Sequence, residues 1–373
     1  MKRLTLLLCV LALFPLQNLS ASPQVIQSEK ANFVLEEVLY GLDIPWGMAF
    51  ISDTQILVTE RDGTIKLVDT QRKTLTPIQG APEVHAEGQG GLLDVAVPPD
   101  FKPGDWIYFT FARDINGEGA TTLARAKLSS NRLTQWQDLL QTQSATDTGF
   151  HFGSRIAFDE KGYVYFGVGD RGERSMSQDL SNHIGSVMRL YRDGRVPKDN
   201  PFVKRKDVPP EIWSYGHRNP QGMAYDPTHQ RLWLIEHGPR GGDEINLALP
   251  GRNSGWPVIS YGKEYWGPVA VGEGTHREGM EQPVKQYTPS IAPGSLLLYT
   301  GDSFPAWRGN LFAGALKLEH INRVTLDENG KAIGEERLLE DLEERIRSLA
   351  QSPQGWLYFA TDSGSLYVIK PAR

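Results

Sequence analysis

The stretch "HFGSRIAFDEKGYVYFGVGD", residues 151–170, decides the fold. It contains a short apolar run, the polar residues "DEKG", and a second run rich in aromatic and β-branched residues. Asp and Gly at this spacing are typical of a turn, whereas Tyr, Val and Phe favour extended strands. The stretch therefore predicts a pair of antiparallel strands behind a polar lead-in of His and Gly.

The same pattern recurs five more times along the chain. Each copy has a polar or glycine-containing lead-in, an apolar strand, a turn and a second strand. The other copies begin at Pro45, Gly88, Asn219, Ala292 and Arg345. Hairpin repeats of this length predict propeller blades, with about 58 residues for each of six blades. We therefore predict an all-β fold, a single-domain six-bladed β-propeller over residues 23–373. The alternative is two unrelated all-β domains.

Two further features complete the predicted ring. "FVLEEVLY", from Phe33, is expected to pair with the C-terminal "SLYVIK" and so to remove exposed sheet edges. The uneven spacing of the copies implies insertions between some blades, and the largest lies between the fourth and fifth copies. It contains "RNSGWPVISYGKEYWG", residues 252–267, and loops of this kind usually carry function. No long stretch has the 3.6-residue apolar period of a helical protein.

Residues 1–22 have the composition of a signal peptide. Lys2 and Arg3 precede an apolar stretch over residues 4–16, and small residues follow. That stretch is shorter than the ~20 residues needed to span a bilayer. We therefore expect cleavage near Ala21 or Ser22, a periplasmic or secreted protein, and no stable membrane insertion; the alternative is an uncleaved anchor.

Composition excludes several classes of chemistry. Cys9 is the only cysteine and lies in the predicted signal peptide, so the mature chain would lack thiolate catalysis and Cys-ligated metals. The formal net charge is -6, and no Lys/Arg-rich block is present, which argues against a nucleic-acid partner. A neutral small molecule remains compatible with this composition.

Polar side chains cluster at the lead-ins of the repeats, where the first strand of each blade would line the central channel. The positions that meet at one mouth of this channel are Gln89, His151, Arg218, Asn219, Arg345 and Arg347, with Lys317 as a further cation. Several cations around one axis repel each other unless an anion lies between them. Because Arg suits bidentate carboxylate recognition, this ring predicts a planar ligand with several carboxylates. Taken singly, each residue has a structural alternative: a hydrogen-bonded His, salt-bridged Arg caps, or a Gln that satisfies loop carbonyls.

A second polar cluster lies in "EHGPRGGDEINLALPGRNSGWP", residues 236–257. Asp243 and Glu244 offer hard oxygen ligands suited to calcium, although their spacing does not match the twelve-residue calcium loop. The alternative is an acidic turn without metal. Oxygen donors disfavour zinc and copper. The sequence also lacks a dinucleotide fingerprint and a nucleophile-elbow serine.

These motifs resemble those of a known family. "GQGGLLDV", "HFGSRIAFD", "DNPF", "EIWSYGHRNPQGMA", "EHGPRGGDEIN" and "RIRSL" occur in this order, and the likeness runs from "PWGMAF" to the C-terminus. The sequence is similar to soluble quinoprotein sugar dehydrogenases of the glucose/sorbosone dehydrogenase group, and especially to bacterial periplasmic aldose sugar dehydrogenases. Enzymes of this group use pyrroloquinoline quinone (PQQ), a planar tricarboxylate.

The resemblance implies a role for each matching position. His151 would be the general base that takes the proton of the sugar C1 hydroxyl while hydride passes to the quinone, and Arg218 would stabilise the negative charge that develops there. Contacts to PQQ would come from Gln89, Arg218, Asn219, Tyr265, Lys317, Arg345 and Arg347. The backbone carbonyls of Gly238 and Pro239 would hold a PQQ-bound calcium ion, a Lewis acid.

The resemblance also implies a second, structural calcium, with Glu244 as a ligand. Ser254 lies where relatives often have Tyr, so a ligand there survives only if it is the backbone carbonyl. Ser186 stands where relatives often have Lys.

The expected function is oxidation of aldose sugars at C1 to lactones, with PQQ and calcium as cofactors and a quinone or cytochrome as the undetermined electron acceptor. Two rival hypotheses remain. One is a calcium-dependent lactonase or other hydrolase, which needs a metal ringed by carboxylate and Asn side chains. The other is a non-catalytic propeller that binds sugar or protein.

Overall fold

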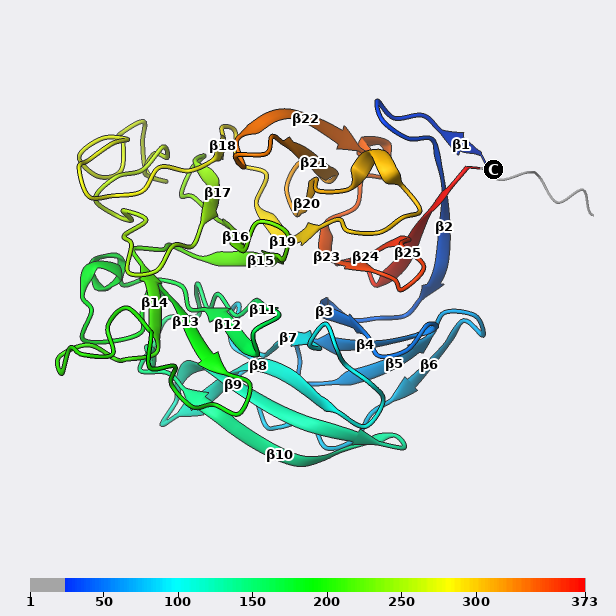
Figure 1. Cartoon of the computed structure of the whole chain (residues 1–373), viewed down its shortest axis with the longest axis horizontal. Coiled ribbons are helices and arrows are strands. Elements are labelled where there is room, and N and C mark those ends of the chain that lie inside the picture. The colour runs from blue at the N-terminus through cyan, green and yellow to red at the C-terminus, as the bar shows by residue number, and fades with distance from the viewer. Residues whose placement is uncertain (1–23, 373) are drawn as a thin grey trace, which may run out of the picture.

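The computed structural model describes residues 24–372, in which six antiparallel sheets surround a central axis (Figure 1). This arrangement confirms the predicted six-bladed β-propeller. The predicted signal peptide, residues 1–22, lies outside the described residues. Within residues 24–372, no helix is long and apolar enough to cross a membrane.

The first three blades follow one another along the chain. Blade one contains β3 (Pro45–Phe50), β4 (Gln55–Glu60), β5 (Ile65–Asp69) and β6 (Thr74–Pro77). Blade two contains β7 (Leu92–Ala96), β8 (Trp106–Ile115), β9 (Glu118–Ser129) and β10 (Arg132–Gln141). Blade three contains β11 (Ile156–Phe158), β12 (Tyr163–Gly167), β13 (Ser186–Tyr191) and β14 (Ile212–Tyr215).

The remaining blades continue the ring, and the described residues include three short 3-10 helices in loops. Blade four contains β15 (Pro220–Asp226), β16 (Arg231–Glu236), β17 (Asp243–Leu247) and β18 (Lys285–Tyr287). Blade five contains β19 (Pro293–Leu298), β20 (Leu311–Ala315), β21 (Ile321–Leu326) and β22 (Ala332–Leu338). Blade six contains β23 (Ile346–Gln351), β24 (Leu357–Thr361), β25 (Ser365–Pro371), β2 (Phe33–Tyr40) and β1 (Val25–Ile26). The helices are η1 (Arg174–Gln178), η2 (Pro305–Trp307) and η3 (Glu340–Leu342).

Blade six joins the two ends of the described chain. β2 pairs antiparallel with β25, with Leu35 opposite Ile369, so the predicted closure is confirmed. The aromatic ring of Phe33 is fully buried there and packs edge-on against Trp307. A sheet built from both ends leaves no gap in the ring and no free inner edge.

The first strand of each repeat forms the inner strand of its blade. β3, β7, β11, β15, β19 and β23 contact one another in sequence, and β23 returns to contact β3. The second strand of each blade is buried on both faces because neighbouring blades cover it; in β4 the segment Ile56–Glu60 is buried throughout. This explains why these strands are almost continuously apolar rather than alternating.

The largest insertion lies inside blade four, between β17 and β18, and not between blades four and five. It does lie between the fourth and fifth copies of the repeat, as predicted. The expectation that it separates two blades was wrong, because the short strand β18 completes blade four only after the insertion. The insertion therefore begins and ends at the same blade. In Figure 1 its loops lie at the left, beside β17 and β18, and Tyr261, Lys263 and Tyr265 of the insertion line a cavity together with Lys317.

The buried Arg155 directly precedes β11 of blade three and contacts residues of the other five blades. Its guanidinium donates to Asp94 Oδ1 at 2.9 Å and lies 4.0 Å from the ring centre of Trp46. Its other acceptors are backbone oxygens of Gln221 at 2.9 Å, Gly294 at 2.6 Å and Arg347 at 3.1 Å. Its contact residues Trp46, Gln221 and Arg347 line one cavity of the channel, of about 280 Å³. Arg155 itself lines a second cavity, of about 230 Å³. The Arg155 side chain therefore closes the channel between the two cavities.

Candidate active site at the mouth of the channel

His151 lies in the lead-in of blade three, with its backbone in the left-handed region at φ 54°. Its backbone N–H donates to Gln89 Oε1 at 2.9 Å, so two of the predicted residues are in direct contact. Gly169 makes this conformation possible, because a Cβ at that position would lie 2.2 Å from the carbonyl oxygen of His151. The backbone around His151 is thus fixed by a side chain from blade two and by the close approach of a glycine.

The imidazole of His151 is held by Asp170, which follows β12. Nδ1 lies 2.5 Å from Oδ1 of this fully buried carboxylate. Asp170 also accepts hydrogen bonds from the backbone N–H of Gly172 at 2.9 Å and from Nε1 of Trp256 at 2.8 Å. Since a carboxylate accepts, Nδ1 of His151 carries the proton, and Nε2 keeps the lone pair that a general base needs.

Burial and charge act on both partners. Burial lowers the pKa of His151, the hydrogen bond to Asp170 opposes this, and the positive charges of Arg218 and Arg171 lower the pKa further. For Asp170, burial favours the neutral form, but the hydrogen bond from His151 and nearby positive charge outweigh it, so the pKa of the carboxyl is lowered. The result is a neutral imidazole beside a charged carboxylate at neutral pH.

Arg218 reaches the same mouth from the loop before β15. Its backbone oxygen accepts from the Asp170 N–H at 2.7 Å, which ties the two loops together. Its guanidinium donates to the carbonyl of His237 at 3.1 Å and to the Tyr265 hydroxyl at 3.4 Å. Nε of Arg218 is buried and has no hydrogen-bond partner among the described residues. A buried donor without an acceptor is costly, so this atom is ready for an incoming acceptor.

Asn219 is buried beside Arg218, but its side-chain oxygen is already used. Oδ1 accepts from the backbone N–H of Gly153 and from Nε2 of Gln221, both at 3.2 Å. These contacts join blades three and four at the mouth. Only the amide nitrogen of Asn219 remains for another partner.

Arg345 and Arg347 share one carboxylate, Asp362, which follows β24. Arg345 Nε lies 2.9 Å from Oδ2, and Arg347 lies 2.8 Å from Oδ1 and 3.0 Å from Oδ2. Arg345 also donates to the carbonyl of Leu316 at 2.8 Å. The salt-bridged arrangement considered as an alternative is therefore present, but two cations on one carboxylate still leave an excess of positive charge.

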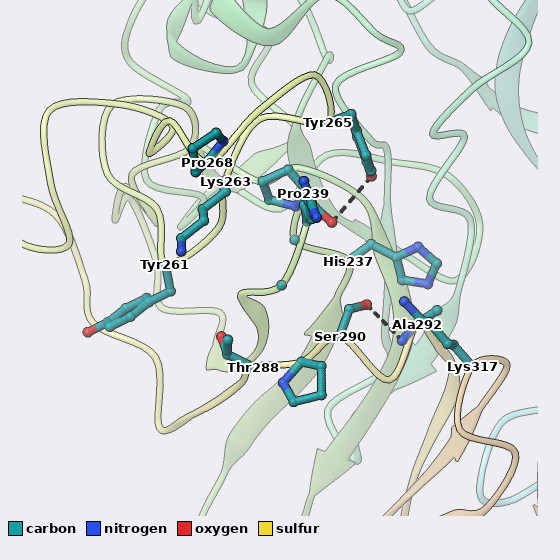
Figure 2. A pocket seen from close by; sticks show the side chains of 14 residues that line it. His237, Pro239, Tyr261, Lys263, Tyr265, Pro268, Thr288, Ser290, Ala292 and Lys317 are labelled. Atoms are coloured by element: carbon teal, nitrogen blue, oxygen red, sulfur yellow. Dashed lines mark hydrogen bonds between the residues drawn. The ribbon is translucent and has the colours of Figure 1, made fainter.

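Two connected cavities open at this mouth. The first, of about 280 Å³, is lined by Gln89, Arg345 and Arg347 together with Arg61, and the second has a volume of about 720 Å³. His237 and Ala292 line both. Figure 2 shows the larger cavity, in which Tyr265 reaches the carbonyl of Pro239 at 3.3 Å, and Lys317 lies beyond Ala292. Lys317 adds a cation to the lining of this larger cavity.

His237 joins the two cavities and was not predicted. Its Nε2 lies 2.7 Å from the carbonyl oxygen of Pro293, which makes that nitrogen the donor. Burial, together with the positive charge of nearby groups including Arg218, lowers the pKa of His237 to about 3. This imidazole is therefore neutral and presents Nδ1 as an acceptor.

Asp243 and Glu244, the first two residues of β17, have different roles. Both oxygens of Asp243 are used, because they accept from Ser290 Oγ and from the backbone N–H groups of Gly238, Ile291 and Ala292 at 2.7–2.9 Å. Asp243 therefore shapes the loop that carries the carbonyls of Gly238 and Pro239. Residues 24–372 contain no cluster of three His, Cys, Asp or Glu side chains that could hold a metal.

Glu244 faces a small adjoining cavity of about 20 Å³ that is also lined by Arg218, Gly238 and Ser254. Burial, with the nearby charge of Glu236, raises the pKa of Glu244 to about 8. Asn246 donates to its carboxyl group at 3.1 Å. The cavity offers about the space of one small ion or one water molecule.

The predicted residues thus fall into one mouth and one adjoining pocket. Gln89, Tyr265, Lys317, Arg345 and Arg347 line the two cavities. His151, Arg218 and Asn219 hydrogen-bond to residues that line them. Arg218 also lines the small cavity together with Glu244 and Ser254. Ser186 lies in β13 and is buried. The structure adds residues that the sequence did not identify: Asp170, His237, Trp256 and Asp362.

Comparison with known proteins gives consistent results. A family model described as glucose/sorbosone dehydrogenase matches residues 42–368. The aldose sugar dehydrogenase YliI of Escherichia coli K12 is 40% identical over 340 residues, which cover 88% of this chain and 91% of YliI. The apo crystal structure of the soluble aldose sugar dehydrogenase from Escherichia coli is 38% identical, with a TM-score of 0.87 over 91% of this chain and 100% of that one. The PQQ-bound structure of an aldose sugar dehydrogenase from Streptomyces coelicolor is 26% identical, with a TM-score of 0.74 over 94% and 99% of the two chains.

Proposed function

Because the chain belongs to the glucose/sorbosone dehydrogenase family, and is thus an oxidoreductase, we propose that it oxidises aldose sugars at the C1 hydroxyl to lactones with PQQ as its cofactor. The observation that carries this proposal is the hydrogen bond of 2.5 Å between His151 and Asp170 beside the guanidinium of Arg218. Asp170 fixes the tautomer of the His151 imidazole, and the positive charge of Arg218 lies close to this base.

The residues present fit PQQ. Nε of Arg218 is a buried donor without a partner among the described residues, and Lys317 lines the larger cavity together with Tyr265, which Arg218 contacts. Arg345 and Arg347 retain an excess of positive charge after pairing with Asp362. A planar tricarboxylate would satisfy these donors, with Gln89, Asn219 and Tyr265 as further contacts. When bound, PQQ would supply the two-electron acceptor for oxidation of the sugar at C1.

His151 would act as the general base. Nε2 is the free nitrogen, and its lone pair would take the proton of the C1 hydroxyl. Asp170 would stabilise the imidazolium that forms, because its carboxylate accepts the Nδ1 proton. Arg218 would stabilise negative charge as it develops on the reacting group, since hydrogen bonds to the Asp170 N–H and the Glu236 carboxylate fix its backbone and the His237 carbonyl holds its guanidinium.

Calcium would occupy two places. The carbonyls of Gly238 and Pro239 would hold one ion together with the cofactor, because Asp243 already fixes the loop that presents them. Glu244 and the backbone carbonyl of Ser254 would hold a second ion in the small cavity, where a cation would keep the buried carboxylate charged. These donors are hard oxygens, as calcium prefers.

Neither rival hypothesis is favoured by an observation at this mouth. A calcium-dependent hydrolase needs carboxylate and Asn side chains around an axial metal, whereas the axis here is closed by Arg155 and the mouth is cationic. A non-catalytic propeller has no need for the His151–Asp170 pair. We also propose export to the periplasm or the medium on the basis of residues 1–22, with a quinone or a cytochrome as the final electron acceptor.

The test is reconstitution of the cofactor-free protein. PQQ and calcium are added separately and together, and oxidation of glucose or another aldose is followed with an artificial dye acceptor. We expect activity only when both are present, with a lactone as the product. Activity without PQQ, or a lack of activity with every aldose when PQQ is bound, would contradict the proposal.

A further inference from the structure

We propose that Trp256, at the start of the insertion in blade four, is a positioning residue for His151, acting through Asp170. Its indole N–H donates to Asp170 Oδ2 at 2.8 Å, while Oδ1 of the same carboxylate holds His151. The proposal rests on the general-base role of His151 proposed above.

Trp256 also contacts the cation beside the base. The guanidinium carbon of Arg218 lies 5.2 Å from the centre of the indole ring, and that of Arg174 lies 5.6 Å from it. The indole is buried and so excludes water from the far side of the Asp170 carboxylate. One side chain therefore touches both the carboxylate that orients the base and the arginine beside it.

The insertion holds this indole in place through several contacts with blade three. The backbone N–H of Trp256 donates to the carbonyl of Gly216 at 2.9 Å, and its carbonyl accepts from Gln178 Nε2 at 2.7 Å. Further along the insertion, Glu264 forms a two-point ion pair with Arg174 at 2.6 and 3.0 Å. Trp256 is thus a fixed contact between the insertion and the base, not a freely moving side chain.

Loss of the indole N–H should have a defined electrostatic effect. Asp170 would keep only the hydrogen bonds from His151 and Gly172, so its negative charge would be less well stabilised. A more basic carboxylate holds the Nδ1 proton more strongly, so His151 would stay protonated to a higher pH. The other charged or titratable groups that face His151 are Arg171, Arg218 and His237, and they would be unchanged.

The test is Trp256→Phe, which keeps an aromatic ring but removes the donor. We expect kcat to fall on the order of 10-fold while the affinity for PQQ, measured by titration of cofactor absorbance, stays the same. The acid limb of kcat/KM should move to higher pH. The matched control is Trp213→Phe, which removes an indole N–H that donates to the carbonyl of Ala248 at 2.8 Å, away from the site. This control should leave kcat and the pH profile unchanged.

A second measurement does not require catalysis. An NMR titration of the imidazole of His151 in the full mature chain should show a higher pKa in Trp256→Phe than in wild type and in Trp213→Phe. In addition, Trp256→Phe should add little further loss of kcat in an Asp170→Asn background, because both act through one carboxylate. An unchanged titration of His151, or independent losses in the double variant, would overturn the proposal. An inactive wild type with a shifted titration would refute the dehydrogenase role and leave the positioning intact.

Discussion

The Asp170 carboxylate accepts a hydrogen bond from His151, with 2.5 Å between Oδ1 and Nδ1, and the Asp170 backbone N–H donates to the carbonyl of Arg218 at 2.7 Å. The base and the neighbouring cation are therefore positioned by the same residue. Asp170 follows β12, whereas His151 and Arg218 come from the lead-ins of two blades. A change at Asp170 is therefore expected to affect both His151 and Arg218.

Replacement of His151 by Ala should abolish turnover while PQQ still binds. The imidazole is the group with a free nitrogen beside Asp170, whereas the positive charge for the cofactor comes from other residues. Turnover is measured with an aldose and a dye acceptor, and cofactor binding by absorbance titration. Undiminished activity in His151→Ala would refute the role of the base.

Replacement of Asp170 by Asn should lower kcat about 100-fold, because the neutral amide cannot stabilise the imidazolium that forms at His151. The pKa of His151 should fall in this variant, since the hydrogen bond and charge of Asp170 both raise it. The acid limb of kcat/KM would then move to lower pH, opposite to the direction expected for Trp256→Phe. A shift in the same direction for both variants would be inconsistent with this electrostatic arrangement.

The pH dependence of the wild-type enzyme follows from the burial of His151. Burial holds the pKa of its imidazole below the ordinary value of 6.5, so the free base is already present at pH 6.5. As the pH falls, the imidazole takes up a proton and kcat/KM is lost. We therefore expect the midpoint of the acid limb below pH 6.5, measured with saturating dye and PQQ. A midpoint above pH 6.5 would show that Asp170 outweighs burial and the arginines.

The repeat pattern predicted the residues of the mouth that precede the first strands, but not those that follow the second strands. The geometry of an antiparallel pair explains why both groups lie at the mouth. Lead-in positions such as His151 and Arg218 are visible because each precedes an apolar run. In an antiparallel pair, however, the end of the second strand returns to the start of the first: Ile346 lies opposite Thr361, and Pro220 opposite Glu236. The residues at or just beyond the ends of second strands therefore reach the same mouth, as Asp170 and Asp362 do.

Other residues could not be located from the repeat pattern. Trp256 approaches from an insertion that has no counterpart in the other blades, so its distance to Asp170 depends on loop packing. The convergence of backbone oxygens on Arg155 depends likewise on the closed ring, because three blades each provide one carbonyl. Sequence periodicity places residues on a strand or at its end, but it does not give contacts across the axis.

Replacement of Arg155 by Met should destabilise the propeller by about 3–5 kcal/mol, because it leaves the buried carboxylate of Asp94 without its charged partner. The free energy of unfolding is measured by denaturant titration. The control is Arg195→Met, which breaks an exposed pair with Asp193 and should cost at most about 1 kcal/mol. Equal losses in the two variants would show that contacts with the other five blades give Arg155 no special role in stability.

Replacement of Glu244 by Gln should remove the effect of calcium on stability in the absence of PQQ. Without PQQ, the site at Gly238 and Pro239 lacks its cofactor ligands, so the small cavity lined by Glu244 and Ser254 is the expected binding place. Calcium at 100 times its Kd stabilises a single site by about 2.7 kcal/mol, and the wild-type Tm should rise accordingly. In Glu244→Gln, the Tm should not respond to calcium.

The same variant distinguishes the loss of a ligand from damage to the fold. Burial raises the pKa of Glu244 to about 8, so at pH 7 the calcium-free wild type holds a largely neutral carboxyl that Gln resembles. The Tm of Glu244→Gln in excess chelator should therefore equal or exceed that of wild type. The control is Asp207→Asn, which alters an exposed carboxylate paired with Arg205 and should retain the full response to calcium. An equal rise in Tm for wild type and Glu244→Gln would place calcium elsewhere, whereas a low Tm of Glu244→Gln in chelator would indicate that the carboxyl group supports the fold without metal.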